Sequence, residues 1–290
     1  MDIKIPASAA EIIDKLNKHG YEAYIVGGCV RDMLLGREPG DWDITTSALP
    51  YQVKKVFRRT VDTGIQHGTV TVLMGKAGYE VTTYRIDGEY LDGRHPDSVS
   101  FTPDLREDLK RRDFTINAMA YNSREGIVDA FGGREDLKAG IIRCVGNAQD
   151  RFLEDALRIL RAIRFSAQLG FAVEEKTYEA IRAIAPNLVH VSKERIQAEL
   201  TKLLISRHPE RMALIWEAGI SPYISPAFSG LWEEKALPSV PASVPAVKHM
   251  RWAAFLRLAS PENAVKVLKE LKTVSYTHLR AHETAANIVC

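Results

Sequence analysis

The pattern of hydrophobic residues changes at about residue 140, and this change constrains the fold more than any other feature. Short runs rich in β-branched and aromatic residues, typical of strands, occur only before it, at 24–26, 41–45, 69–74, 79–84 and 127–130. After it the period is helical, at 147–168, 174–185, 192–206, 208–220 and 244–259. We therefore predict an α+β head followed by an all-helical tail.

The head also contains helical segments and one long aperiodic stretch. Helices are expected from residue 7 to Gly20, at 30–35, at 50–57 and at 105–120. Residues 86–104 are rich in glycine, proline and aspartate, which predicts a long and mobile functional loop. Residues 221–243 are rich in serine and proline, and we expect them to be a connector between helices.

Composition limits the class of protein. The 290 residues are 46% hydrophobic and 26% charged with a net charge of +2, so a disordered or fibrous chain is excluded and any basic surface must be local. Cys29, Cys144 and Cys290 form no paired spacing, which favours a reducing compartment. No signal-like start or long apolar run occurs, so the sequence predicts a cytoplasmic protein that does not enter the membrane.

Two glycines separate the first strand from the next helix, in the sequence GGCVRD. Gly27 and Gly28 would let a ligand approach the backbone closely, and free amide groups at the start of the helix could bind phosphate together with Arg31. The alternative is a tight structural turn followed by a surface ion pair between Arg31 and Asp32.

The sequence DWD follows shortly afterwards. If this segment is a strand, Asp41 and Asp43 share a face with Cα atoms about 7 Å apart, and a bound cation would relieve their mutual repulsion. Carboxylate oxygens are the ligands that Mg²⁺ prefers, so we predict a metal site beside the glycine turn, with Glu80 as a candidate third ligand. The alternatives are two solvated aspartates in a turn and a surface glutamate at a strand edge.

The sequence RRDFTIN supplies a third group. Arg112, Asp113 and Asn117 lie at helical spacing, and an arginine can bind phosphate while an aspartate and an asparagine bind ribose hydroxyls. The alternative is a charged, solvated helix face.

The sequence EDALR begins the helical tail. Asp155 and Arg158 are three residues apart on a helix, where a carboxylate could accept from an exocyclic amino group while a guanidinium donates to a ring nitrogen. Cytosine and adenine present that pattern and uracil and guanine present the reverse, so one pair could select C and A. The alternative is an ordinary helix in which Arg158 pairs with Glu154.

Together these segments resemble the class II tRNA nucleotidyltransferases, the CCA-adding enzymes, and the related bacterial poly(A) polymerases. GGCVRD with DWD looks like the metal motif of that family, and RRDFTINAMA looks like its ribose motif. Asp129 with GGREDL resembles the hinge motif, EDALRILRAIRF the base-selecting motif, and KERIQAEL the last motif of the neck. The resemblance runs from about residue 5 to about residue 272.

The resemblance implies a nucleotidyltransferase head of the DNA polymerase beta type with a mixed sheet, followed by a helical neck and a partial body. The implied reaction adds C, C and A to the 3′ end of tRNA from CTP and ATP, with two Mg²⁺ ions on Asp41 and Asp43 and release of pyrophosphate. By the same resemblance, the loop at 86–104 would help the change from C to A addition. Nucleotide contacts are implied for Gly27, Gly28, Arg31, Arg112, Asp113, Asn117, Asp155, Arg158, Arg161 and Arg164.

Arg161 and Arg164, with Lys193 and Arg195, would alternatively support the neck through salt bridges or contact the acceptor stem. Poly(A), CC-adding or A-adding activity, or an RNA-binding remnant without activity, are the alternative functions. The implied partners are tRNA, CTP and ATP, and the sequence indicates no obligate protein partner.

The expected boundaries are a head at 1–140, a neck at 141–206, a partial body at 207–273 and a non-native tail at 274–290. Relatives are longer, so we expect a chain truncated at its C-terminus. The sequence SYTHLRAHET in the tail resembles translated sequencing-adaptor read-through.

Overall fold

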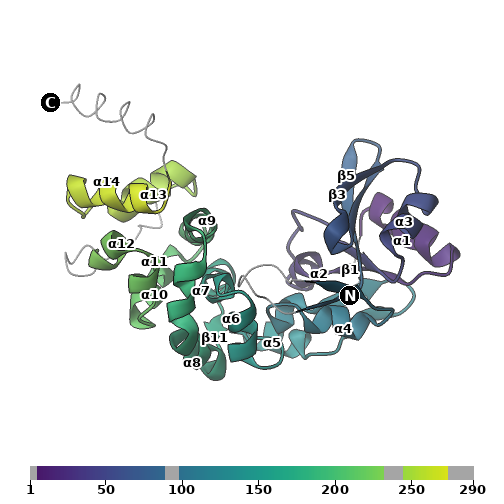
Figure 1. Cartoon of the computed structure of the whole chain (residues 1–290), viewed down its shortest axis with the longest axis horizontal. Coiled ribbons are helices and arrows are strands. Elements are labelled where there is room, and N and C mark those ends of the chain that lie inside the picture. Colours follow the sequence, from purple (N-terminus) through teal and green to yellow (C-terminus); the bar gives the residue numbers. More distant parts are fainter. Residues whose placement is uncertain (1–4, 89–97, 232–243, 274–290) are drawn as a thin grey trace. The chain divides into compact units, whose positions relative to one another are not determined.

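The computed structural model describes residues 5–88, 98–231 and 244–273 of the chain. The chain forms two compact units, residues 1–148 and residues 149–290, each of which is described by itself (Figure 1). The first unit contains the sheet and the second is helical. The α+β class predicted from the change of period is therefore confirmed.

A mixed seven-stranded sheet forms the first unit. Its order is β3-β4-β5-β2-β1-β8-β9, in which β2 is parallel to β5 and every other neighbouring pair is antiparallel. The strands are β1 (Ala23–Val26), β2 (Ile44–Thr46), β3 (Thr60–Gly64), β4 (Thr69–Met74), β5 (Ala77–Thr83), β8 (Met119–Asn122) and β9 (Gly126–Asp129).

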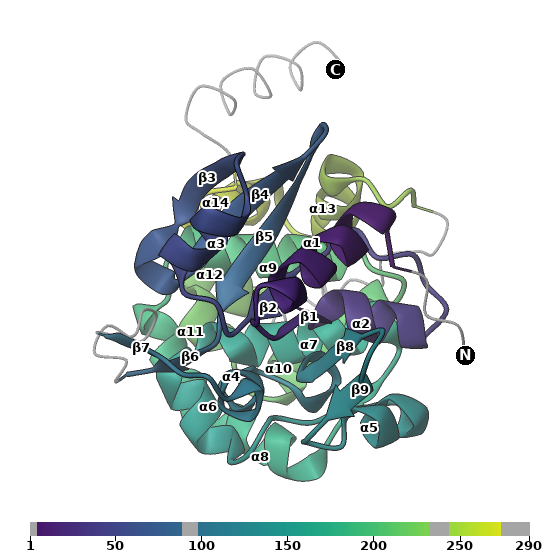
Figure 2. The same cartoon turned by 90° about the vertical axis from the view of Figure 1, so that its right-hand side faces the viewer.

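Helices cover both faces of the interior strand β1, all four of whose residues are buried. α1 (Ala7–Lys18) buries Ile12, Ile13 and Leu16 at helical spacing and lies against β1 and β2 (Figure 2). The other helical segments are α2 (Gly28–Leu34), α3 (Pro50–Val56), η1 (Ile65–His67), α4 (Leu105–Lys110), η2 (Thr115–Asn117) and α5 (Gly133–Ala139).

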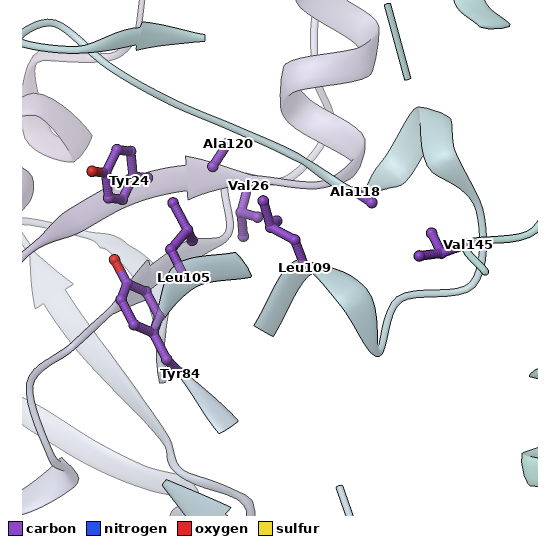
Figure 3. Close-up of a cluster of buried hydrophobic side chains, with 8 residues drawn as sticks. All are labelled: Tyr24, Val26, Tyr84, Leu105, Leu109, Ala118, Ala120 and Val145. Atoms are coloured by element: carbon purple, nitrogen blue, oxygen red, sulfur yellow. The ribbon is translucent and has the colours of Figure 1, made fainter. Parts of the chain in front are cut away.

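A second hydrophobic cluster packs α4 against the sheet. Because side chains alternate along a strand, Tyr24 and Val26 share one face of β1. Leu105 and Leu109 of α4 join them there. The whole cluster, drawn in Figure 3, consists of Tyr24, Val26, Tyr84, Leu105, Leu109, Ala118, Ala120 and Val145. It fixes the position of α4 and of the charged residues that α4 carries.

The prediction of one helix over 105–120 is wrong. α4 ends at Lys110, the only further helical turn is η2, and β8 begins at Met119. Backbone hydrogen bonds with residues 143–145 take the chain out of the helix: Val145 donates to the Asp113 carbonyl over 3.1 Å and Thr115 to the Arg143 carbonyl over 3.0 Å. Sequence spacing could not reveal these long-range partners.

The ends of the predicted loop at 86–104 are also ordered as strands. β6 (Arg85–Asp87) pairs antiparallel with β7 (Val99–Phe101). Three-residue strands are too short to show a period of two, so the sequence could not indicate them. The centre of the predicted loop, residues 89–97, lies outside the described residues.

The second unit is helical, as predicted, apart from β11 (Ala172–Val173). The two-residue strand β10 (Ile141–Ile142) lies in the first unit, just after the predicted limit of strands. The helices are α6 (Ala148–Glu154), α7 (Leu157–Leu169), α8 (Glu175–Ile184), η3 (Ala185–His190), α9 (Lys193–Leu204), η4 (Pro209–Ala213), α10 (Leu214–Glu217), α11 (Ser221–Ile224), α12 (Pro226–Gly230), α13 (Lys248–Leu256) and α14 (Pro261–Glu270).

Two predictions for this unit are wrong. The single helix over 147–168 is broken at Asp155 and Ala156, between α6 and α7. Part of the predicted connector at 221–243 is helical, because α11 and α12 bury Phe228 against Trp216, with ring centroids 4.8 Å apart. The rest of that connector, and the predicted tail at 274–290, lie outside the described residues.

No helix in the described ranges is long and apolar enough to cross a membrane. The division between the two compact units follows residue 148, and the predicted head boundary at 140 stays a prediction. The boundary between neck and body at 206 stays a prediction. Cys29 and Cys144 are both buried, and neither forms a disulfide bond within the described residues.

Candidate functional site

The glycine turn joins β1 to α2 and has a conformation that requires glycine. Gly27 has φ of 81°, in the left-handed region, and a Cβ atom there would lie 2.9 Å from Nη1 of Arg112. In this structure the group that lies close to the Gly27 backbone is the guanidinium of Arg112, and the approach of a ligand stays a prediction.

Arg31 extends from α2 to the segment that follows α4. It is 9% exposed, donates from Nη1 to Oδ1 of Asn117 over 2.7 Å, and makes two 2.9 Å hydrogen bonds to the carboxylate of Asp32. The ion pair with Asp32 that we considered as a structural alternative is present. The bond to Asn117 additionally joins two segments that the sequence indicated separately.

Asp113 and Asn117 are in contact, although they do not lie on one α-helix as predicted. Nδ2 of Asn117 donates to Oδ1 of Asp113 over 3.1 Å, and the same oxygen accepts from the Phe114 amide over 2.8 Å. Both side chains are less than 10% exposed. The fold thus brings Gly27, Arg31 and Asn117 together with Arg112 and Asp113.

The two aspartates of DWD precede the strand on which we placed them. β2 begins at Ile44, so the prediction of a strand over 41–45 is wrong at its first residues. The carbonyl of Asp43 still accepts from the Val26 amide over 3.0 Å, which holds Asp43 at the end of the ladder. Both aspartates are exposed and line a cavity of about 480 Å³.

Burial and neighbouring charges shift the pKa of Asp43, which lines this cavity, and of Arg112. The protein around the Asp43 carboxyl removes part of its hydration and raises its pKa; Arg112 opposes this shift, and the negative charge of Asp41 adds to it. Burial lowers the pKa of Arg112, and Asp43 is one of the carboxylates that oppose that change. Arg112 therefore lies within electrostatic reach of Asp43.

Glu80 lines the same cavity as Asp41 and Asp43. In the parallel pair of β2 and β5, Ile44 is opposite Val81, so Asp43 and Glu80 each precede paired residues. However, no group of three or more His, Cys, Asp or Glu side chains in the described part of the chain is arranged to hold a metal ion. The role of Glu80 as a third ligand stays a prediction.

Sequence reasoning missed one residue of this site, Asp108. Its side chain is 0% exposed, and it contacts Arg112 as well as Arg111. From the sequence we named Arg112, Asp113 and Asn117 in this segment and considered a charged, solvated helix face only as the alternative. The signal that could have identified Asp108 is its position three residues after Leu105 and next to Leu109, on the apolar face of α4.

In the second unit, Asp155 and Arg158 are bound to different partners. Asp155 lies in the break between α6 and α7, where Oδ1 accepts from the Leu157 amide over 3.0 Å and Oδ2 accepts from Arg195 over 2.7 Å. Arg158 pairs with Glu154, as the structural alternative predicted, and donates to the Arg151 carbonyl over 3.1 Å. A base-reading role for Asp155 and Arg158 stays a prediction.

Arg164 makes the contacts of the salt-bridge alternative. It pairs with the buried Glu199 of α9, donates to Gln168 over 2.7 Å, and stacks 3.8 Å from the ring centroid of Phe165. Arg161 lies 5.4 Å from the same ring centroid. These contacts stabilise the packing of α7, and a nucleotide contact of either arginine stays a prediction.

Comparison with known proteins identifies two families along the chain. Residues 23–143 match the poly(A) polymerase head domain, and residues 170–231 match a domain described as a probable RNA- and SrmB-binding site of polymerase A. Asp41, Asp43, Arg112 and Asn117 all lie inside the first match.

Individual relatives agree with these matches. The chain is 52% identical over 230 residues to a CCA-adding enzyme of Geobacillus thermodenitrificans, which covers 79% of this chain and 57% of that protein. The crystal structure of the Bacillus stearothermophilus CCA-adding enzyme in complex with CTP is similar with a TM-score of 0.82 and 43% identity, over 93% of this chain and 66% of that one. The Thermotoga maritima CCA-adding enzyme complexed with tRNA is similar with a TM-score of 0.68 and 26% identity, over 93% and 67%.

The chain spans about half the length of the curated relatives it matches. Its sheet order, its glycine turn and its paired aspartates all lie within the shared part. The chain belongs to the family of tRNA nucleotidyltransferases and poly(A) polymerases.

Proposed function

We propose that this chain is a CCA-adding nucleotidyltransferase that transfers CMP and AMP from CTP and ATP to the 3′ end of tRNA. The observation that carries the proposal is the convergence of Arg112 on Gly27 beside Asp43. The guanidinium of Arg112, which could bind phosphate, thus lies near the carboxylate of Asp43. The similarity to a CCA-adding enzyme in complex with CTP supports the nucleotide, and the similarity to one complexed with tRNA supports the acceptor.

The arginines would bind the triphosphate. Arg112 is largely buried, and its Nε has no hydrogen-bond partner among the described residues. A buried guanidinium with an unpaired donor is costly, and an anionic phosphate oxygen would satisfy it. Arg31 is bound to Asn117 through Nη1 and would hold that amide for the ribose.

Asp41 and Asp43 would hold divalent cations. Their donor atoms are all oxygen, and the charge of Asp41 adds to burial, which is the main cause of the raised pKa of Asp43, so the pair fits a hard cation such as Mg²⁺. A cation bound there supplies positive charge to the transferring phosphate and to the departing pyrophosphate. In the reaction, the 3′-hydroxyl oxygen forms a bond to the α-phosphorus, and the bond to the bridging oxygen of pyrophosphate breaks.

Asp155 and Arg158 would select the base in the second unit. Asp155 is bound to Arg195, and Arg158 is bound to Glu154. To read a base edge, each residue would either bind the nucleotide in addition to this partner or exchange the partner for the nucleotide. A site that hydrogen-bonds cytosine and adenine would reject uracil and guanine by leaving polar groups unpaired.

The test is nucleotide addition by the purified chain. It is incubated with Mg²⁺ and tRNA that lacks its 3′ end, with CTP alone, ATP alone, both, or UTP and GTP. The proposal expects two additions with CTP alone and a third only when ATP is also present. Repeated A addition would indicate a poly(A) polymerase, two C residues without A a CC-adding enzyme, and no addition an RNA-binding protein.

A further inference from the structure

The carboxylate of Asp108 is the most completely enclosed charge in the described part of the first unit. Its side chain is 0% exposed, and four other residues donate to it or pair with it. Thr45 on β2 donates from Oγ1 over 3.2 Å, and the Arg85 amide on β6 donates over 3.4 Å. Arg111 donates from Nε over 3.0 Å and from Nη2 over 2.8 Å, and Nη2 of Arg112 lies 3.5 Å away.

A buried carboxylate is stable only when partners replace its hydration. Burial by itself would raise the pKa of Asp108, but the charges of Arg111 and Arg112 outweigh it and hold the pKa below its ordinary value. Asp108 therefore remains ionised at neutral pH. Its charge in turn compensates two adjacent arginines that would otherwise repel each other.

The contact with Asp108 determines which edge of the Arg112 guanidinium is available. Nη2 faces Asp108, Nη1 lies against the backbone of Gly27, and Nε has no partner among the described residues. With Nη2 and Nη1 placed in this way, Nε is the donor that is left for a ligand. Asp108 thus turns the remaining donors of Arg112 away from α4.

The same carboxylate reaches the strand that follows the paired aspartates. Thr45 is two residues after Asp43, and its hydroxyl is bound to Asp108. One buried charge therefore holds both the arginine and the strand whose first residue follows Asp43. Asp113 also acts electrostatically on Arg112, and its carboxylate is bound to the Phe114 amide and to Asn117.

We propose that Asp108 is a positioning residue for nucleotide binding, which orients Arg112 toward the triphosphate and fixes the distance between Arg112 and the Asp41–Asp43 pair. This inference rests on the proposed function, because it assumes that Arg112 binds phosphate. Asp108 itself touches no substrate, since it is enclosed.

The test is the affinity of the full chain for CTP in the variant Asp108→Asn, which keeps the shape and removes the charge. The matched control is Asp136→Asn, because Asp136 is also buried and also binds a threonine hydroxyl and an arginine, Thr115 and Arg143. We expect the dissociation constant for CTP to rise about tenfold or more in Asp108→Asn and less than about twofold in Asp136→Asn. Thermal unfolding of both variants reports the structural loss that they share.

A double-mutant cycle distinguishes positioning from general loosening. In the background of Arg112→Ala, the further change Asp108→Asn should leave CTP affinity unchanged, because the residue that Asp108 orients is gone. An equal loss in both backgrounds, or equal losses in Asp108→Asn and Asp136→Asn, would overturn the inference.

Three further outcomes can be distinguished. If Asp108→Asn does not fold, Thr45→Val removes one neutral donor to Asp108, and unchanged CTP affinity in that variant overturns the inference. If the unmodified chain does not bind CTP, the proposed function fails, and this inference fails with it. Normal CTP binding by the unmodified chain and by Asp108→Asn overturns only the positioning role.

Discussion

Arg31 and Asn117 lie 86 positions apart in the sequence, and a 2.7 Å hydrogen bond from Nη1 to Oδ1 joins them in the buried part of the first unit. The bond ties the helix after the glycine turn to the turn before β8. The segments GGCVRD and RRDFTIN therefore form one structure, and the positions of the proposed phosphate and ribose groups depend on each other.

Replacing Asn117 tests this dependence. Asn117→Ala leaves Arg31 without one acceptor and Asp113 without one donor, so the free energy of unfolding should fall by about 1–3 kcal/mol and the KM for CTP should rise. Asn122→Ala is the matched control, because Asn122 is an equally buried asparagine whose Nδ2 binds the Ala23 carbonyl. Urea unfolding and steady-state kinetics measure both effects. An equal rise in KM for the two variants would contradict a specific role for Asn117.

The paired aspartates should be essential for chemistry and dispensable for RNA binding. Asp41→Ala and Asp43→Ala should each lower the rate of nucleotide addition by several orders of magnitude, because each variant lacks one of the two carboxylates that would hold the cation. The affinity for tRNA should not change. Asp62→Ala is the control, since Asp62 is an exposed aspartate in the same unit that pairs with Lys54. Near-normal turnover in either site variant would exclude the proposed metal site.

Asp108 should contribute to the acid sensitivity of the fold. Its pKa lies below the ordinary 3.8 in the folded state, so its contribution to stability is fully present above that pH and is lost as the pH falls through the lower, folded value. Urea unfolding at pH 6, 4 and 3 should show a steeper loss for the unmodified chain than for Asp108→Asn. If both proteins lost the same free energy of unfolding as the pH fell, other carboxylates would determine the acid sensitivity.

Base selection should depend on Asp155 and Arg158. Asp155→Ala removes an acceptor and Arg158→Ala a donor, each worth about 1–3 kcal/mol, so UTP and GTP incorporation should rise roughly 10- to 100-fold relative to CTP and ATP. The control is Glu194→Ala, which removes an exposed carboxylate from the same unit. The measurement is kcat/KM for all four nucleotides. An equal decrease for every nucleotide would show that both residues have only a structural role.

The periods of the sequence predicted the class of each unit well and the ends of its elements poorly. α1, α2, α3 and β4 lie where their patterns indicated, because each of these elements has a clear apolar face or run. β6, β7 and η2 were not indicated, because a segment of three residues is too short to establish a repeating pattern. The break at Asp155 was also missed, because apolar residues on both sides continue one helical stripe.

Local chemistry determined the candidate residues. A glycine pair, paired aspartates and an arginine-rich segment are visible in the chain because each is complete within a few positions, and the resemblance to a known family rests on their order. The left-handed conformation of Gly27 follows from that local sequence, since only glycine adopts it without strain.

Tertiary structure alone decided which of these residues meet. The approach of Arg112 to Gly27, the bond between Arg31 and Asn117, and the enclosure of Asp108 all join residues from separate elements. Such contacts depend on sheet order and on which helix face is buried, and many pairings of the same segments satisfy the same local pattern. The sequence by itself therefore determined the kinds of groups present, and packing decided that Asp108 is a buried partner of Arg112 and not a solvated charge.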